Sequence, residues 1–206
     1  LYMLISLLGL LLAYMSGSIP SGYWLGKLFY HTDISQHGSG NTGTTNVFRV
    51  LGVAPGLITF FLDAFKGYLP AYLAFSVFQP AFHPIFYGLA AVLGHAFSIF
   101  NRFKGGKAVA TSCGVAFAMY PIYLLSMLGI FFATLFISSM VSLASMVAIG
   151  SAFVFSFLLD DLVFTIAVGF LFLFVLYRHK DNIVRIKNGT ESHVPFGLNS
   201  SKKQGK

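Results

Sequence analysis

Apolar residues fill most of this chain in long, nearly uninterrupted segments that short polar connections separate. A transmembrane helix needs roughly 20 consecutive apolar residues. The lengths of the segments therefore predict an all-α, polytopic membrane protein. The apolar segments are residues 3–30, 54–79, 84–100, 108–138, 140–158 and 161–177.

The fourth segment, residues 108–138, is too long for one comfortable span, and Pro121 interrupts it early. Its length alone leaves open one long tilted helix or two shorter spans. The charges of the connections decide between these alternatives, because basic residues gather on the cytoplasmic side of membrane proteins.

Lysine and arginine occur in the connections 31–53, 101–107 and 178–206, whereas 80–83 and 158–161 contain neither. The positive-inside rule places the first three in the cytoplasm and the last two outside. Because each span takes the chain across the membrane once, this placement requires an outside turn near Tyr120–Pro121 and an inside turn near Ser138–Ser142. We therefore predict seven transmembrane helices, with the N-terminus outside and the C-terminus cytoplasmic.

Composition supports lipid as the solvent of this protein. The 206 residues are 56% hydrophobic and 9% charged, with a mean hydropathy of +0.78, whereas soluble domains carry about 25% charge. We expect one membrane domain over residues 1–198 and a polar tail over 199–206.

The single cysteine, Cys113, excludes an internal disulfide and a cysteine-based metal cluster. The carboxylates are scattered, so we expect no metal and no cofactor, and activity independent of Mg²⁺.

The connection 31–53 is rich in glycines and in side-chain hydrogen-bond donors. Its glycines allow backbone N–H groups to turn toward a ligand, and Arg49 adds a planar fork suited to phosphate or carboxylate. A flexible connector is the alternative, but such connectors rarely hold this many donors. We favour an anion site built from Gly38, Ser39, Gly40, Asn41, Gly43, Thr44, Thr45, Asn46 and Arg49.

The connection 101–107 places three basic residues around the pair Gly105-Gly106, directly before a predicted helix. A helix N-terminus beside Lys104 and Lys107 is a good phosphate cradle. Membrane anchoring by basic residues is the alternative, but anchoring does not require a glycine pair. His95, in the preceding segment, is equally compatible with a proton relay and with a structural role.

Two further groups of polar residues stay ambiguous. Arg178, Asn182 and Arg185 share one face at helical spacing. Alone, this pattern predicts a solvated basic face. A binding site becomes the better interpretation only together with the other basic connections. Asp63 and Lys66, within the second apolar segment, are helical neighbours. Charges at membrane depth must pair or face a polar cavity, so an ion pair and a substrate contact are equally compatible.

Together, the basic connections predict that the protein binds an anion, a phosphate above all, at the membrane surface. The chain has no G-x-S-x-G, no H-E-x-x-H and no cysteine–histidine set. A transporter for organic anions is the competing class, but it should show repeats and polar groups at both membrane faces. No repeat is visible in this sequence, and the outside connections carry few polar groups.

The motifs, in this order, resemble the bacterial acyl-phosphate:glycerol-3-phosphate acyltransferase family, the PlsY family, over nearly the whole chain. The resemblance rests on Gly-Ser-Gly-Asn-Thr-Gly-Thr-Thr-Asn with Arg49, Gly-His95 with Phe-Lys-Gly-Gly-Lys107, Ser142, and His179 to Asn182 followed by Gly-Thr-Glu191. It implies transfer of a fatty acyl group from acyl phosphate to the 1-hydroxyl of glycerol 3-phosphate. The products are lysophosphatidic acid and phosphate.

The resemblance also implies a monomer in the bacterial cytoplasmic (inner) membrane, whose active site faces the cytoplasm. Its partners are the two substrates and membrane lipid, with no nucleic acid. The implied catalytic residues are Ser39, Arg49, Lys104, His179, Asn182 and Glu191. The implied substrate-binding residues are Gly38, Gly40, Asn41, Thr45, Asn46, His95, Gly105, Gly106, Lys107, Ser142, Arg178 and Arg185.

Among these, Ser39, Arg49, Lys104, Ser142, Arg185 and the amides of Gly105-Gly106 are expected to hold the two phosphates. His179 and Asn182 orient the glycerol hydroxyl or the donor phosphate. The general base stays open between His179 and the donor phosphate. No histidine has an aspartate five residues later, so the signature of acyltransferases that use acyl-CoA or acyl carrier protein is absent.

Overall fold

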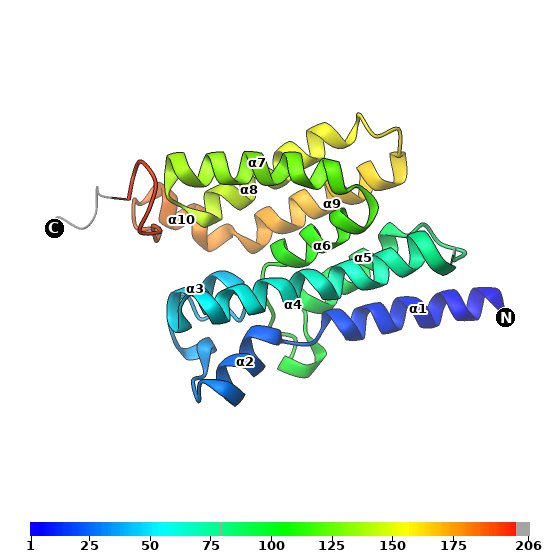
Figure 1. Ribbon diagram of the computed structural model, residues 1–206, viewed down its shortest axis with the longest axis horizontal. Helices are drawn as coiled ribbons and strands as arrows, with labels where there is room; N and C mark the ends of the chain where they lie inside the picture. The colour runs from blue at the N-terminus through cyan, green and yellow to red at the C-terminus, as the bar shows by residue number, and fades with distance from the viewer. Residues whose placement is uncertain (79, 201–206) are drawn as a thin grey trace. The chain divides into compact units, whose positions relative to one another are not determined.

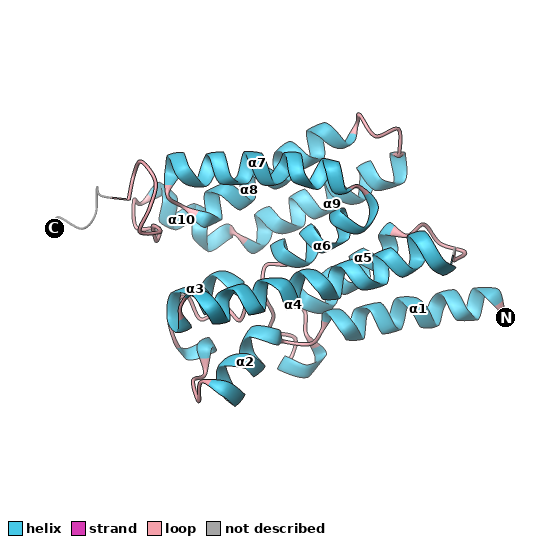
Figure 2. Ribbon diagram, viewed as in Figure 1, coloured by secondary structure: helices cyan, strands magenta, loops and turns pink. Residues whose placement is uncertain are grey.

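The computed structural model describes residues 1–78 and 80–200 as helices joined by short loops, and it has no strand in these ranges (Figures 1 and 2). The all-α prediction is confirmed for this part of the chain. The chain divides into two compact units, unit 1 (Leu1–Pro121) and unit 2 (Ile122–Lys206). The expectation of one membrane domain over residues 1–198 stays a prediction.

Unit 1 is built around one long central helix, α4. Helices α3, α5 and α6 all pack against α4, and α1 packs along α5. The contact between α4 and α6 depends on a small residue, because a Cβ atom on Gly114 would lie 1.8 Å from the Ala64 carbonyl oxygen. The helices are α1 (Tyr2–Gly17), α2 (Ser21–Phe29), α3 (Thr44–Leu51), α4 (Val53–Tyr72), α5 (Ile85–Ala96) and α6 (Val109–Met119).

The first apolar segment, residues 3–30, forms two helices. Helix α1 ends at Gly17 and α2 begins at Ser21, with a bend of 42° between them. Pro20 stands directly before α2. Because proline has no N–H to donate, it interrupts the hydrogen bonding of a continuous helix.

Unit 2 contains three apolar helices and one short polar helix. Tyr123 of α7 donates a hydrogen bond to the Ala152 carbonyl of α8 (2.5 Å) and its ring meets Phe164 of α9 edge-on. Helices α8 and α9 also pack against each other. The helices are α7 (Pro121–Ser138), α8 (Val141–Ser156), α9 (Leu162–Arg178) and α10 (Lys180–Lys187).

The division of the long segment 108–138 is confirmed. One helix ends at Met119 and the next begins at Pro121, where proline is favoured as the first helical residue. A second break, at Ser139 and Met140, falls within the predicted turn near Ser138–Ser142. Ser139 has a φ of 57°, which interrupts the helix before α8 begins.

By length and composition, α7 is long and apolar enough to cross a membrane unaided. Two bent helix pairs, α1 with α2 and α9 with α10, are also long and apolar enough if each pair is one broken span. The described residues therefore contain one to three candidate spans.

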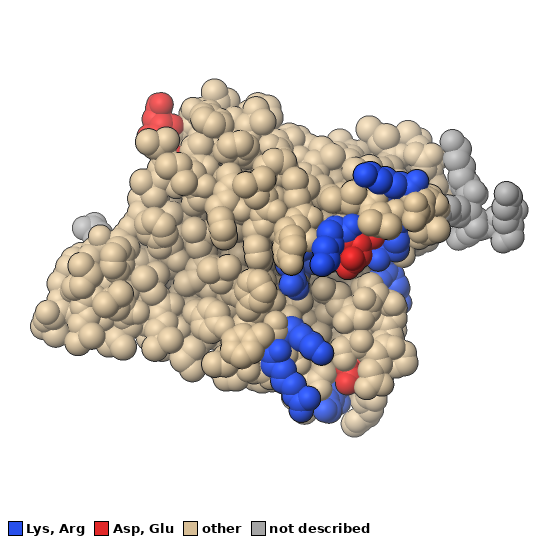
Figure 3. Space-filling view, turned by 180° about the vertical axis from the view of Figure 1, so that it is seen from behind, with Lys and Arg blue, Asp and Glu red and all other residues tan. Residues whose placement is uncertain are grey.

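Most of the face in Figure 3 carries no charged side chain, and its Lys and Arg residues gather in a few groups. Lipid solvates such an apolar exterior. The count of seven spans and their orientation stay predictions.

Candidate active site

The connection before α3 folds around the side chain of Asn46, which is almost fully buried. Its Nδ2 donates to the carbonyl oxygens of Ile34 (2.9 Å) and His37 (3.0 Å). Its Oδ1 accepts from the Ser39 N–H (2.8 Å) and from Arg49 Nη1 (3.4 Å). These bonds give Asn46 a structural role in the loop, which the expectation of substrate contact did not foresee.

The glycines of this loop are required by its shape. Gly38 has a φ of 62°, and a Cβ atom on it would lie 2.3 Å from Asn46 Oδ1. Gly43 precedes α3 and donates its N–H to Asn41 Oδ1 (2.8 Å). The loop is thereby fixed rather than flexible. Its exposed members, which a ligand can reach, are Gly38, Ser39, Gly40, Thr45 and Arg49.

The pair Gly105-Gly106 packs directly on His95. A Cβ atom on Gly105 would lie 1.9 Å from the His95 carbonyl oxygen, and one on Gly106 would lie 2.1 Å from His95 Nε2. The Gly106 N–H donates to the His95 carbonyl (3.2 Å). The expectation that both amides bind phosphate is therefore corrected for Gly106. Lys104 is exposed, and α6 begins at Val109 as expected.

The two glycine loops of unit 1 meet. A Cβ atom on Gly43 would lie 3.6 Å from Gly106 Cα, so the segment before α3 touches the segment before α6. These two motifs, about 60 residues apart in the sequence, are therefore adjacent in unit 1. Their contact is the main feature that the sequence could not predict for this unit.

The Asp63–Lys66 pair of α4 is an ion pair, with Lys66 Nζ 2.7 Å from Asp63 Oδ1 and both side chains buried. Lys66 Nζ also donates to the Ile19 carbonyl (2.7 Å), between α1 and α2. The ambiguity between ion pair and substrate contact is thus decided in favour of the ion pair.

Unit 2 carries a second polar cluster, organised by the buried carboxylate of Glu191. Its Oε1 accepts from Ser142 Oγ (2.7 Å) and Asn182 Nδ2 (2.7 Å), and its Oε2 accepts from Arg185 Nε (2.8 Å). Burial raises the pKa of Glu191, but these three donors lower it by more, so that the net pKa lies below its ordinary value. The carboxylate is charged at neutral pH.

His179 lies at the junction of α9 and α10 and is buried. Its Nδ1 is 2.8 Å from the Val175 carbonyl oxygen. Because a carbonyl oxygen only accepts, Nδ1 carries the hydrogen. In a neutral ring, Nε2 is then the nitrogen that can accept a proton.

The chain bends by 58° between α9 and α10. Arg178 is the last residue of α9, whereas Asn182 and Arg185 belong to α10. The expectation that these three residues share one helical face is therefore wrong. His179 breaks the helix between them, and Glu191 holds Asn182 and Arg185 from outside the helix.

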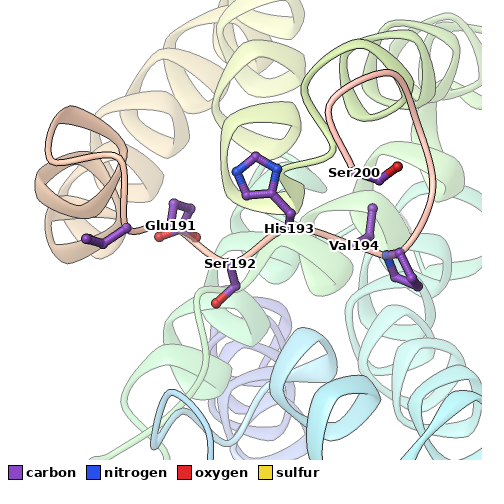
Figure 4. A pocket seen from close by; sticks show the side chains of 7 residues that line it. Glu191, Ser192, His193, Val194 and Ser200 are labelled. Atoms are coloured by element: carbon purple, nitrogen blue, oxygen red, sulfur yellow. The ribbon is translucent and has the colours of Figure 1, made fainter. Parts of the chain in front are cut away.

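A pocket of about 300 Å³ borders this cluster in unit 2. Figure 4 shows the chain from Glu191 to Val194 along the pocket wall, with the His193 and Ser192 side chains on opposite sides of the chain. His193 and Ser192 stand outside the recognised motifs, and their residue types gave no signal of a pocket. Its lining residues are Thr190, Glu191, Ser192, His193, Val194, Pro195 and Ser200.

A sequence profile described as glycerol-3-phosphate acyltransferase matches residues 7–189. The chain belongs to this family. A glycerol-3-phosphate acyltransferase of Streptococcus pneumoniae (strain Taiwan19F-14) is 47% identical over 205 residues, which cover 95% of this chain and 96% of the relative. That of strain Hungary19A-6 is 48% identical over 206 residues, with the same coverage.

Two solved structures of PlsY (YgiH), an integral membrane glycerol 3-phosphate acyltransferase, are also similar. The glycerol 3-phosphate form has a TM-score of 0.87 at 39% identity and covers 92% of this chain and 95% of that chain. The lysophosphatidic acid form has a TM-score of 0.84 at 39% identity and covers 91% and 94%. The resemblance to the PlsY family is confirmed, and the chain is a helical membrane acyltransferase.

Proposed function

We propose that this acyltransferase moves a fatty acyl group from acyl phosphate to the 1-hydroxyl of glycerol 3-phosphate, giving lysophosphatidic acid and phosphate. The observation that carries the proposal is the contact between the two glycine loops of unit 1, which present Ser39, Arg49 and Lys104 at the surface. The similar PlsY structure in its glycerol 3-phosphate form supports a phosphate ester as the ligand.

In the proposed reaction, the hydroxyl oxygen of glycerol 3-phosphate attacks the carbonyl carbon of the acyl phosphate. A new ester C–O bond forms, the C–O bond to the phosphate breaks, and the hydroxyl proton passes to a base. Because acyl phosphate is already activated, the protein mainly orients the substrates and neutralises their charge. This role suits a site that offers cations and amides but no covalent nucleophile.

Basic and polar residues of both units form the set proposed to bind phosphate. In unit 1, Ser39, Arg49 and Lys104 bind the phosphate of glycerol 3-phosphate, with support from the fixed loop around Asn46. In unit 2, Glu191 fixes the side chains of Arg185 and Asn182, which belong to the set proposed to bind phosphate. The remaining residues of the substrate-binding set assist: Gly38, Gly40, Asn41, Thr45, His95, Gly105, Lys107, Ser142 and Arg178.

The donor phosphate is the proposed base, since one of its oxygens lies close to the reacting carbonyl in the substrate itself. His179, through Nε2, orients that phosphate. Replacing His179 by alanine is then expected to lower kcat by about 10- to 100-fold, the effect of losing a hydrogen bond to a charged group. The dependence of the rate on pH should keep its wild-type shape.

The rate of the His179→Ala variant is measured between pH 5 and 9, with His31→Asn as the control at an exposed loop position. The donor phosphate is not the base if two results occur together. The wild-type rate would rise with pH through about 6.5, the ordinary pKa of histidine, and the rate of His179→Ala would not change with pH. That result would make His179 the general base.

Purified protein in lipid, supplied with palmitoyl phosphate and glycerol 3-phosphate, tests the proposed function. Phosphate release should require both substrates and should accompany formation of lysophosphatidic acid. Tight binding of glycerol 3-phosphate without release would instead favour the competing class, an organic-anion transporter. The family name already disfavours that class.

The proposal also includes the cellular setting. The protein acts as a monomer with seven transmembrane helices in the bacterial cytoplasmic (inner) membrane, its N-terminus outside and its C-terminus inside. The active site faces the cytoplasm, where the connections near 31–53, 101–107 and 178–193 carry the basic residues. Neither a metal nor another cofactor takes part.

A further inference from the structure

Asp63 of α4 contacts two other helices in addition to its neighbour Lys66. Only 1% of its surface is exposed. Its Oδ1 lies 2.7 Å from Lys66 Nζ and 3.7 Å from His95 Nδ1 of α5. Its Oδ2 accepts a hydrogen bond of 3.4 Å from Thr44 Oγ1, at the start of α3. One buried carboxylate thus joins three helices of unit 1.

Both helices that Asp63 reaches lead into the glycine loops. Thr44 follows Gly43, the residue whose added Cβ would lie 3.6 Å from Gly106 Cα. His95 supports the other loop, because Gly105 packs on its carbonyl and Gly106 packs on its ring at Nε2. The carboxylate therefore contacts one residue adjoining each of the two loops.

An ion pair between Asp63 and Lys66 alone would leave these further contacts unexplained. Residues three apart on a helix can pair without help from other elements. Here the same carboxylate also faces Thr44 and His95, and Lys66 extends to the Ile19 carbonyl (2.7 Å). Buried charges are expensive unless they are paired and hydrogen-bonded, so these partners restrict where α3 and α5 can lie.

We infer that Asp63 is a positioning residue, which sets the two glycine loops of unit 1 at the spacing that binds the phosphate of glycerol 3-phosphate. This inference rests on the proposed function. Asp63 itself stays buried and does not touch the substrate. Its influence passes through Thr44 to the first loop and through His95 to the second.

Asp63→Asn tests the inference, because asparagine keeps the size of the side chain and removes its charge. The KM for glycerol 3-phosphate should rise by about tenfold or more, while kcat stays within about threefold, since a misplaced loop weakens binding of this substrate. Thr44→Val should raise KM in the same direction, and Thr44→Ser, which keeps the hydroxyl, should restore it. Asp160→Asn, at an exposed residue of unit 2, is the control.

Hydrogen–deuterium exchange gives a readout that does not depend on activity. In Asp63→Asn, exchange should increase in residues 38–46 and 104–108 and stay unchanged in α7. Unchanged protection of both loops, or faster exchange throughout the protein with KM unaltered, would overturn the inference. A wild-type protein without acyl transfer would refute the proposed function instead, and the exchange of the two loops would still decide the role of Asp63.

Discussion

Replacing Gly105 by alanine is expected to lower kcat/KM for glycerol 3-phosphate by about 100-fold, the effect of misplacing a binding group by about 1 Å. The added Cβ would lie 1.9 Å from the His95 carbonyl oxygen and 2.8 Å from the Ala96 carbonyl carbon. Both are backbone atoms in the last turn of α5, so they cannot rotate away as a side chain can. The loop itself must move, and Lys104 moves with it.

Gly129→Ala is the matched control for this substitution. A Cβ atom on Gly129 meets nothing within 4 Å, and the residue lies inside α7, where alanine is favoured over glycine by about 0.5–1 kcal/mol. This variant should keep its activity and melt at the same or a higher temperature. The two variants are compared by initial rates on equal amounts of monodisperse protein. Near-wild-type kinetics for Gly105→Ala would show that the contact with His95 does not position Lys104.

Replacing Glu191 by glutamine should also lower kcat/KM by about 100-fold. The carboxylate accepts hydrogen bonds from Ser142, Asn182 and Arg185, whereas glutamine offers one oxygen and a donating NH₂ group. At least one of the three donors then faces another donor. Each lost hydrogen bond to a charged group costs about 1.5–3 kcal/mol, and Arg185 also loses its ion pair.

A double variant tests whether Glu191 acts through Arg185. If Glu191 acts by holding Arg185, the double variant Glu191→Gln/Arg185→Gln should lose far less activity than the two single losses combined. Asp181→Asn, exposed on the same helix α10, serves as the control. Single effects that multiply in the double variant would mean that the two residues act independently.

Pattern and charge predict the helices of this protein well, because both act locally. Long apolar segments indicate helices, and Pro121 divides residues 108–138 where the charge argument required a break. The same reasoning missed the breaks at Pro20 and His179. In both places the apolar or helical pattern continues across the break, so hydrophobicity gives no signal.

The sequence predicts a set of candidate site residues but not how they are arranged. A glycine pair between lysines indicates exposed amides and close packing equally well, and in this protein the Gly106 amide bonds to His95. Asn46 resembles a ligand donor, yet its amide holds the loop together. The contacts of Asp63 with Thr44 and His95 depend on how α3, α4 and α5 pack, which spacing along the chain does not encode.

A comparison of acyl donors shows whether acyl phosphate supplies the acyl group. Protein in lipid receives glycerol 3-phosphate with either palmitoyl phosphate or palmitoyl-CoA, and lysophosphatidic acid is quantified by mass spectrometry. We predict lysophosphatidic acid from palmitoyl phosphate, with one phosphate released for each product molecule, and none from palmitoyl-CoA. Lysophosphatidic acid from palmitoyl-CoA and none from palmitoyl phosphate would show that acyl phosphate is not the donor.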